Sequence, residues 1–315
     1  MYIGLDIGGT KCSAVVGSLG ENVEILDKIS FPTAGKTPDQ ILALFSDFIT
    51  EKQKSYKIEG IGIACGGPLD SKLGLIKKPP SLPLWDNIEI VKYFEEKFSI
   101  PTYLKNDADA CAVAEWLYGA GKGSQNMIFI TFGTGFGAGL ILNGKLYSGT
   151  NDNAGEIGHV RLRKSGPVGY NKAGSCEGFC SGSGIRRLAL LEIEKLEKKG
   201  LLPDFLQKVG GVDGVTAKSI AEHARLGDKF CQRIYKLSGK MLGETLSILI
   251  DLFNPEKIVI GGVFMRSGDL LYPYAEKVIK KESLIYSQRV VKVVPAKLSE
   301  NIGDVSALAV AKGEL

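Results

Sequence analysis

Strand-like and helix-like patterns of apolar residues alternate along the first 118 residues. A strand shows as a short apolar run that ends at glycine or proline, whereas a helix shows as apolar residues three and four positions apart. Asp86 or Asn87 is placed to cap a helix that runs to about Phe98. The other predicted elements are strands at residues 2–7, 12–17, 58–64 and 101–104 and helices at residues 41–56 and 108–118.

The next part of the chain repeats the first pattern. Residues 127–142 form an apolar strand, a glycine turn with a threonine and a second apolar strand, as residues 2–17 do. Strands and helices alternate on both sides of the small, polar segment 119–124, so we expect an α/β fold with mixed sheets and two related halves. Residues 143–180 are rich in loops. The remaining predictions are helices at residues 185–199, 216–225, 228–252 and 304–313 and a strand at residues 257–260.

Composition excludes several classes of protein. Among 315 residues, 39 Lys and Arg face 35 Asp and Glu, and the net charge of +4 is too balanced for a protein that coats nucleic acid. No run approaches the roughly 18 apolar residues of a membrane span, and the early Asp6 is unlike a signal peptide. Six scattered cysteines predict reduced, buried thiols. We therefore expect a cytoplasmic protein that binds neither nucleic acid nor membranes.

Two glycine hairpins carry the first chemical signal. In the first, Asp6 precedes Gly8 and Gly9, and Thr10 and Lys11 follow them. The N–H groups of such a turn can cradle a phosphate, and a hydroxyl and a cation suit its oxygens. A carboxylate before the turn can hold Mg²⁺ through water. For this segment alone, an ordinary turn between strands remains the alternative.

The second hairpin has glycines at every second position of a strand pair, at Gly133, Gly135, Gly137 and Gly139. Glycine weakens a strand, so this spacing favours a ligand. The segment lacks the Gly-Lys-Ser/Thr of a Walker loop, and it leads into a strand rather than into the helix of a dinucleotide-binding motif. With a further turn at Gly261 and Gly262, the hairpins predict three backbone approaches to one elongated anionic ligand.

Five motifs in this order resemble the ROK family of bacterial sugar kinases and related repressors. They are Asp6-x-Gly8-Gly9-Thr10-Lys11, Asn106-Asp107, Gly133-Thr134-Gly135-x-Gly137-x-Gly139, Gly155-Glu156-x-Gly158-His159 and Gly261-Gly262. The motifs cover almost the whole chain. The resemblance implies an α/β, two-domain actin-like ATPase (ribonuclease H-like) fold with mixed sheets and an interdomain cleft that closes over ATP, Mg²⁺ and a hexose.

The resemblance also implies a domain division. A small domain would comprise residues 1–119, completed by a C-terminal helix at residues 303–315, and a larger domain would comprise residues 120–302. The two helices that cross between the domains would be those at 108–118 and 304–313. Both carry alanines four positions apart that would permit close packing, Ala110 with Ala114 and Ala307 with Ala311.

Site residues follow from the same motifs. Asp107 would be the general base that accepts the proton of the sugar hydroxyl, with a plain helix cap as the alternative. His159 would contact the sugar, with a hydrogen-bonded structural imidazole as the alternative. The implied sugar-binding residues are Gly67, Asn106, Asp107, Glu156, His159 and Glu177. The implied ATP-binding residues are Asp6, which would also hold Mg²⁺ through water, Gly8, Gly9, Thr10, Lys11, Gly133, Thr134, Gly135, Gly261 and Gly262.

One segment departs from the family. Many members bind structural zinc through this histidine and three cysteines in Cys-x-Cys-Gly-x-x-Gly-Cys. In the register set by Gly174 and Glu177, the cysteine positions hold Val168, Tyr170 and Ser175. Valine cannot bind zinc, and neutral Tyr and Ser are poor ligands. Cys176 and Cys180 lie out of register. We therefore expect ATP and Mg²⁺ as cofactors and no zinc.

The expected activity is ATP-dependent phosphorylation of a hexose, of the hexokinase or glucokinase type. Glucose is the first expectation, because most unassigned members of the group are called glucokinases. The alternatives are N-acetylmannosamine, N-acetylglucosamine, fructose and β-glucosides. A non-catalytic sugar-sensing protein related to ROK repressors is the alternative from another class. The repressors carry a helix-turn-helix domain before the first hairpin, and with Asp6 so early in the sequence we expect no such domain here. A homodimer is a further expectation.

Overall fold

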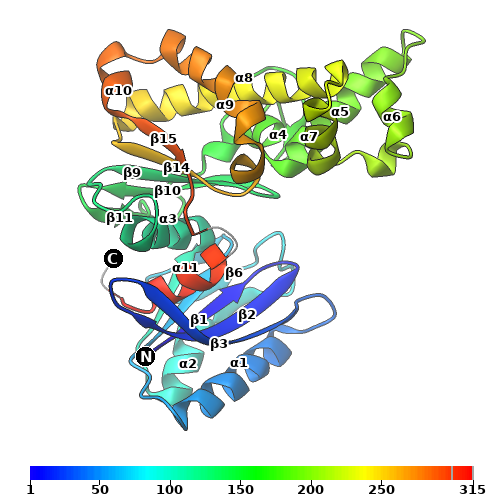
Figure 1. The fold of residues 1–315 in the computed structure, drawn as a ribbon. Coiled ribbons are helices and arrows are strands. Elements are labelled where there is room, and N and C mark those ends of the chain that lie inside the picture. Colours follow the sequence, from blue (N-terminus) through cyan, green and yellow to red (C-terminus); the bar gives the residue numbers. More distant parts are fainter. Residues whose placement is uncertain (299–300, 314–315) are drawn as a thin grey trace. The chain divides into compact units, whose positions relative to one another are not determined.

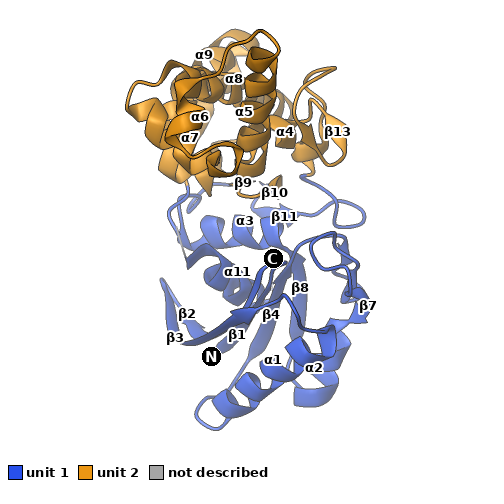
Figure 2. Ribbon diagram, turned by 90° about the vertical axis from the view of Figure 1, so that its right-hand side faces the viewer, with its two compact units in different colours: residues 1–129, 139–155, 296–315 blue, residues 130–138, 156–295 orange. Residues whose placement is uncertain are grey.

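The computed structural model describes residues 1–298 and 301–313 and divides into two compact units (Figure 2). The first comprises Met1–Phe129, Gly139–Gly155 and Ala296–Leu315, and the second comprises Ile130–Ala138 and Glu156–Pro295. The expected domain boundary after residue 119 stays a prediction. Residues 314–315 of the expected C-terminal helix, and residues 299–300 of the expected larger domain, lie outside the described residues.

A five-stranded mixed sheet forms the centre of the first unit. Its order is β3-β2-β1-β4-β8. β1 (Tyr2–Ile7) is antiparallel to β2 (Lys11–Leu19) and parallel to β4 (Gly60–Cys65), which is parallel to β8 (Thr102–Asn106). β3 (Val23–Pro32) extends the antiparallel edge. β4 is buried at every position, which explains its continuous apolar run. The four predicted strands of this region are confirmed, with shifted ends.

Helices cover both faces of this sheet (Figure 1). α1 (Pro38–Gln53) and α2 (Ile90–Phe98) lie on one face, and α3 (Asp107–Tyr118) and α11 (Ile302–Val310) lie on the other. The backbone of α11 rests directly on β4, because a Cβ at Gly62 would lie 2.1 Å from Ala307 O. Ala110 and Ala307 belong to one buried cluster, so small residues do permit close packing between α3 and α11.

One predicted helix start was wrong. Asp86 and Asn87 do not cap a helix; they belong to β7 (Asp86–Glu89), which pairs antiparallel with β6 (Leu75–Lys77). β5 (Leu69–Asp70) completes this small sheet. Asn87 has φ +54, a conformation that asparagine tolerates, and the strand pairing overrides the local capping preference. The helix α2 begins only after Glu89.

The second five-stranded sheet has the order β11-β10-β9-β14-β15. Its strands are β9 (Met127–Phe132), β10 (Phe136–Leu142), β11 (Lys145–Tyr147), β14 (Lys257–Ile260) and β15 (Lys292–Pro295). In each sheet a hairpin supplies the second and third strands, β2 and β1 in the first sheet and β10 and β9 in the second. Two strands from later in the chain follow, β4 and β8 or β14 and β15. The repeat seen in the sequence is therefore a repeat of topology, and the division between the units passes through β9 and β10.

Helices make up most of the second unit. The predicted helices appear as α5 (Gly182–Glu197), α7 (Ala217–Arg225, capped by Thr216) and α8 (Lys229–Phe253, capped by Asp228). α9 (Val263–Glu282), which packs on α8, had no sequence-based prediction, nor had β15. The other elements are the helices α4 (Cys176–Cys180), α6 (Asp204–Lys208) and α10 (Ile285–Val290), the 3-10 helices η1 (Ile157–His159) and η2 (Val212–Gly214), and the strands β12 (Val168–Gly169) and β13 (Lys172–Ala173).

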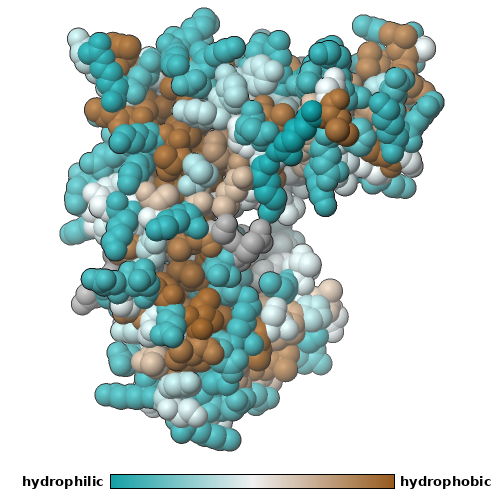
Figure 3. Space-filling model, viewed as in Figure 1, coloured by the Kyte–Doolittle hydropathy of each residue, from teal (hydrophilic) through white to brown (hydrophobic). Residues whose placement is uncertain are grey.

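Polar and apolar side chains are distributed as in a folded globular protein. On the face shown in Figure 3, hydrophilic side chains cover much of the surface and apolar ones form smaller areas. Large apolar side chains such as Phe45, Phe94, Phe129 and Phe205 are buried. Among the described residues, no helix combines the length and the apolar character that crossing a membrane requires.

Candidate active site

The turn between β1 and β2 is built from Gly8 and Gly9. Gly8 N donates to Lys11 O at 3.1 Å, and the Thr33 hydroxyl donates to Gly8 O at 2.6 Å. A Cβ at Gly9 would lie 2.6 Å from the Cβ of Ser81, so the turn is packed closely from a neighbouring loop. Thr10 and Lys11 are exposed. The turn is thus held in one conformation and presents a hydroxyl and an ammonium group to solvent.

Asp6 lies at the end of β1, against the start of α11. Its Oδ2 would be 3.0 Å from a Cβ at Gly303. Desolvation, followed by the charges of Asp107 and Asp304, raises the pKa of Asp6 to about 6. A carboxylate that is poorly solvated and repelled by its neighbours is stabilised by a cation. The first unit therefore offers a suitable carboxylate for Mg²⁺ at this position.

Asp304 and Lys28 are charged neighbours of Asp6 that the sequence did not single out. Asp304 is buried, its Oδ1 accepts a hydrogen bond from Ser13 Oγ at 3.1 Å, and its Oδ2 pairs with Lys28 Nζ. Ser13, Lys28 and Asp304 come from β2, β3 and α11, and the last two are 276 positions apart in the sequence. No local pattern in the sequence could mark such a pair.

Asn106 and Asp107 lie where β8 ends and α3 begins. Asn106 is the N-cap of α3, and its Oδ1 accepts from Ala108 N at 2.9 Å. Asp107 Oδ1 also accepts from Ala108 N, at 2.7 Å. Asp107 is accessible to solvent, yet desolvation raises its pKa above the ordinary value for aspartate. A raised pKa makes a carboxylate a stronger proton acceptor. The hydrogen bond to the helix start and a role as a base are therefore compatible.

Gly66 and Gly67 join this group from the end of β4. A Cβ at Gly67 would lie 3.1 Å from Asn106 Nδ2, and a Cβ at Gly66 would lie 3.8 Å from Asp107 Oδ2. The strands β1, β4 and β8 are parallel, and Cys65 pairs with both Ile7 and Asn106. Their carboxyl ends therefore meet at one edge of the sheet, where α/β proteins bind ligands. The first unit thus brings together Asp6, the Gly8–Lys11 turn, Gly67, Asn106 and Asp107.

The second unit holds a different group of predicted residues around the turn between β9 and β10. Gly133 N donates to Gly135 O at 3.1 Å, and Gly182 N, at the start of α5, donates to Gly133 O at 2.8 Å. Gly262 precedes α9 with φ +63, and a Cβ there would lie 2.2 Å from Phe132 O, so glycine is required. The starts of two helices therefore meet the turn, an arrangement that favours anions.

Not every glycine of this region needs a ligand to explain it. A Cβ at Gly139 would lie 2.5 Å from Ala108 O and 2.6 Å from the Cβ of Ala112, so packing of β10 on α3 accounts for this position. Gly261 N donates to Ile130 O at 2.9 Å and so extends the pairing of β14 with β9. Gly139 therefore has a packing reason of its own, and the expectation of a ligand at the alternating glycines stays a prediction.

A pocket of about 770 Å³ lies beside the turn from Gly133 to Thr134. The volume is in the range of ligand sites. Four cationic side chains and one carboxylate are part of its lining, and Tyr235 contributes a buried aromatic ring. The lining residues are Gly133, Thr134, Gly182, Ser183, Arg186, Thr216, Ala217, Lys218, Ala221, Glu222, Arg225, Tyr235, Val263, Arg266 and Ser267. Apart from the glycine turn, the sequence did not point to this lining, because it comes from four separate helices and the segments before them.

Glu156, His159 and Glu177 also lie in the second unit. Glu156 Oε2 is 3.8 Å from His159 Nε2, across the short helix η1. Glu177 lies in the first turn of α4, and its Oε2 accepts from Phe136 N at 3.3 Å. Glu156 and His159 are exposed and Glu177 is partly exposed. These side chains are therefore accessible to a ligand that carries hydroxyl groups.

Polar and aromatic contacts hold residues 168–178, where the family resemblance led us to expect no zinc. Tyr170 stacks on His159 with ring centroids 3.7 Å apart. Ser175 caps α4: its hydroxyl accepts from Gly178 N and donates to Gly169 O, both at 3.1 Å. Within residues 1–298 and 301–313, no three His, Cys, Asp or Glu side chains are arranged to hold a metal ion. Whether the protein binds zinc stays a prediction.

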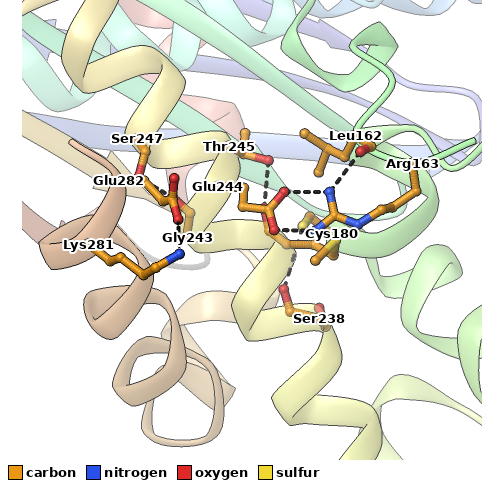
Figure 4. Close-up of polar contacts among 11 residues, drawn as sticks. Leu162, Arg163, Cys180, Ser238, Gly243, Glu244, Thr245, Ser247, Lys281 and Glu282 are labelled. Carbon is orange, nitrogen blue, oxygen red and sulfur yellow. Dashed lines mark hydrogen bonds and ion pairs between the residues drawn. The ribbon is translucent and has the colours of Figure 1, made fainter.

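Two cysteine sulfur atoms of α4 form hydrogen bonds with α8 and so fix α4 in place (Figure 4). Thr245 Oγ1 donates to Cys176 Sγ at 3.3 Å, and Cys180 Sγ donates to Ser238 O at 3.8 Å. Burial raises the pKa of the Cys176 thiol to about 11, and the thiol accepts the hydrogen bond from Thr245 in its protonated form. All six cysteines are free, and all except Cys111 are buried, which confirms the expectation of unpaired thiols.

A salt bridge connects the loop before the β12–β13 hairpin to the same helix. Arg163 Nη1 donates to Glu244 Oε2 at 2.7 Å, and Arg163 Nη2 pairs with Glu244 Oε1 (Figure 4). Arg163 Nη1 also donates to Leu162 O at 2.7 Å. The segment that precedes the hairpin and the helix that carries Glu177 thus have a common support in α8.

Comparisons with known proteins show the family of this chain. The sequence profile described as "ROK family" matches residues 2–314. A glucokinase of Thermotoga maritima is 30% identical over 98% of this chain and 96% of its own length. A ROK family glucokinase from Streptomyces griseus, solved with glucose and AMPPNP, superimposes with a TM-score of 0.79 at 28% identity over 99% of both chains. A xylose repressor of Caldicellulosiruptor bescii is 28% identical over 95% of this chain and 74% of its own length.

Proposed function

The chain belongs to the ROK family, and from this premise we propose that it is an ATP-dependent kinase that phosphorylates a hydroxyl of a hexose. The observation that carries the proposal is Asp107, an accessible carboxylate with a raised pKa at the edge where three parallel strands end. Phosphoryl transfer to an alcohol needs a base at the hydroxyl and stabilisation of the phosphoryl charge. The two units carry residues suited to both tasks.

Asp107 would accept the proton of the attacking hydroxyl. Asn106 would hydrogen-bond a neighbouring hydroxyl through Nδ2, while its Oδ1 stays on the start of α3. The turn that contains Gly8 and Gly9 would donate N–H groups to phosphate oxygens, and Lys11 would add a positive charge. When bound, Mg²⁺ would neutralise phosphate charge, and Asp6 would hold it through a water molecule.

The second unit would bind the nucleotide. Its pocket adjoins Gly133 and Thr134, and the starts of α5 and α9 suit the phosphates. Gly261 and Gly262 would face the adenosine. The basic lining of the pocket, which includes Arg186, favours a ligand that carries negative charge.

Glucose is the substrate we propose first. Two relatives carry the name glucokinase, and the one from Streptomyces griseus was solved with glucose. Glu156, His159 and Glu177 would accept and donate hydrogen bonds to vicinal hydroxyls, and Gly67 would leave room for the ring beside Asn106. N-acetylmannosamine, N-acetylglucosamine, fructose and β-glucosides remain the alternative substrates.

A coupled ADP-release assay over a panel of aldoses, ketoses and N-acetylhexosamines tests the proposal. We expect release that depends on ATP, Mg²⁺ and a hexose, with the highest kcat/KM for glucose. If no sugar stimulates ADP release, the kinase proposal fails. The similarity to a repressor favours one second candidate, a sugar-sensing protein without catalysis. Stabilisation by a sugar in a thermal melt, without ADP release, would support that candidate instead.

A further inference from the structure

A two-residue hairpin lies against the segment that carries His159. β12 and β13 pair antiparallel, with Gly169 opposite Lys172, so Tyr170 and Asn171 form the turn. Both have positive φ, +50 and +56, the combination of a type I′ turn. This turn fixes the direction in which Tyr170 leaves the backbone. The Tyr170 ring lies on the His159 imidazole, with centroids 3.7 Å apart and planes tilted by 22°.

Two further contacts tie the hairpin to the same segment. Lys172 Nζ donates to the backbone oxygen of His159 at 2.7 Å. A Cβ at Gly158 would lie 2.9 Å from Tyr170 Cε2 and 2.1 Å from Phe136 O, so the tyrosine ring and β10 both lie close to the backbone just before His159. The hairpin therefore holds both the backbone and the ring of residue 159.

The other side of the hairpin contacts α4, which carries Glu177. Ser175 Oγ donates to Gly169 O, and a Cβ at Gly169 would lie 2.9 Å from the Cβ of Glu177. In Figure 2, β13 likewise lies beside α4. One short hairpin thus contacts the supports of two proposed sugar-binding side chains.

We propose that Tyr170 is a positioning residue for sugar binding, and this inference rests on the proposed function. The His159 side chain is 45% exposed although one face of its ring lies on the tyrosine ring, so a ligand can still reach it. A side chain that is already oriented loses less freedom when a sugar binds. Tyr170 therefore favours the bound orientation of His159 without contacting the reacting atoms.

The test compares Tyr170→Ala and Tyr170→Phe with a control at another exposed tyrosine, Tyr286→Ala. Alanine and tyrosine both bear a Cβ at positive φ, so the hairpin backbone changes little in Tyr170→Ala. We expect a rise in the sugar KM of about three- to tenfold, the scale of an aromatic stack, with little change in kcat and in the ATP KM. Tyr170→Phe keeps the ring and should match the unsubstituted protein, as should the control.

Histidine NMR supplies a readout that does not depend on turnover. The chain has only two histidines, His159 and His223, so their ring signals can be resolved in protein without a histidine tag. Tyr170→Ala should move the His159 signals through loss of the ring current and leave the His223 signals in place. Unmoved His159 signals would overturn the stack itself. Moved signals with an unchanged sugar KM, or a Phe variant as impaired as the Ala variant, would overturn the positioning role.

The two proposals fail in distinguishable ways. If the unsubstituted protein phosphorylates no sugar, the proposed function falls and the positioning role falls with it, although the NMR shift would still show the stack. If the unsubstituted protein is an active kinase and Tyr170→Ala keeps the same sugar KM, only the positioning role falls.

Discussion

At the scale of single residues, the bond from Ala108 N to Asp107 decides how the proposed base can be tested. Asparagine keeps an oxygen that can accept this hydrogen bond, but it cannot take a proton from a hydroxyl. Asp107→Asn should therefore fold and bind sugar while kcat falls by at least about a hundredfold, the lower scale of general-base effects. Steady-state ADP release and thermal stabilisation by sugar measure the two properties separately.

The control for this variant is Asp70→Asn, which removes a partly exposed carboxylate that pairs with Lys77 in the same unit. It should leave kcat unchanged. Full activity of Asp107→Asn would reduce Asp107 to a residue that only stabilises the start of α3. Loss of sugar binding together with activity would place the side chain in substrate binding rather than in proton transfer.

Local motifs could single out Asp6, Asn106 and Asp107 as candidates, because a carboxylate or amide next to a turn is visible in the sequence. They could not predict Asp304 with Lys28, since the fold alone brings these residues together. The same limit applies to Asp109 and Ser148, whose side chains meet at 2.6 Å across 39 residues. What the sequence misses here is the environment of a site, which depends on contacts between distant segments.

At the scale of elements, the connection from α3 to the segment after β11 depends on Asp109. This residue is 3% exposed, and the Ser148 hydroxyl donates to its Oδ2. Desolvation raises the pKa of Asp109 to about 7; Ser148 and Lys105 act against the shift, whereas Asp152 and Asp107 add to it. The folded protein thus keeps a proton that the unfolded chain has already lost between about pH 4 and 7.

This raised pKa predicts a stability that depends on pH. Since the folded state binds more protons, Asp109 contributes most favourably to the free energy of unfolding below about pH 4. This contribution is lost as the pH rises through about 7. Asp109→Asn keeps an oxygen acceptor for Ser148 but carries no charge. Between pH 5 and pH 8 the unsubstituted protein should lose free energy of unfolding as Asp109 ionises, and the variant should not. The difference in free energy of unfolding between variant and unsubstituted protein should therefore rise by on the order of 2 kcal/mol from pH 5 to pH 8.

Urea denaturation at the two pH values measures this gain. An exposed acid in the same chain, Asp213, supplies the control substitution Asp213→Asn, which should show no such difference. A gain that is equal at pH 5 and pH 8 would mean that the titration of Asp109 does not govern the stability of this connection.

Element prediction succeeded where the local signal and the tertiary contacts agree. Thr216 and Asp228 cap α7 and α8 as the sequence indicated, because an accepting side chain and a helix start coincide there. At Asp86 the same signal was wrong, since β6 offered a strand partner. α9 had no prediction, and it contains Pro273 and a non-helical Ser267, which interrupt a regular helical pattern.

At the scale of the whole molecule, the mixed α/β fold and membership of the ROK family are confirmed, and with them the actin-like ATPase fold class. The repeated strand order of the two sheets explains why two similar glycine hairpins occur in one chain. Each hairpin joins the corresponding strands of its own sheet, so the family motifs are spread over both units although each is local in sequence. Because the motifs lie in both units, their order along the chain reports on almost the whole fold and not on one segment.

The last prediction concerns the whole protein: the folded state should not require a metal ion, whereas the proposed reaction should require Mg²⁺. Residues 168–178 are held by the Ser175 cap, the Tyr170 stack and the buried thiols of α4 that contact α8, so no thiolate site is needed to keep them in place. EDTA should therefore leave the melting temperature unchanged, whereas loss of a structural zinc would cost much of the folding free energy. The same treatment should stop ADP release, and added Mg²⁺ should restore it. Elemental analysis of protein purified without a metal-affinity tag completes the experiment: near-stoichiometric zinc would show that this segment binds metal, and the proposed sugar contacts of His159 and Glu177 would have to be reassigned.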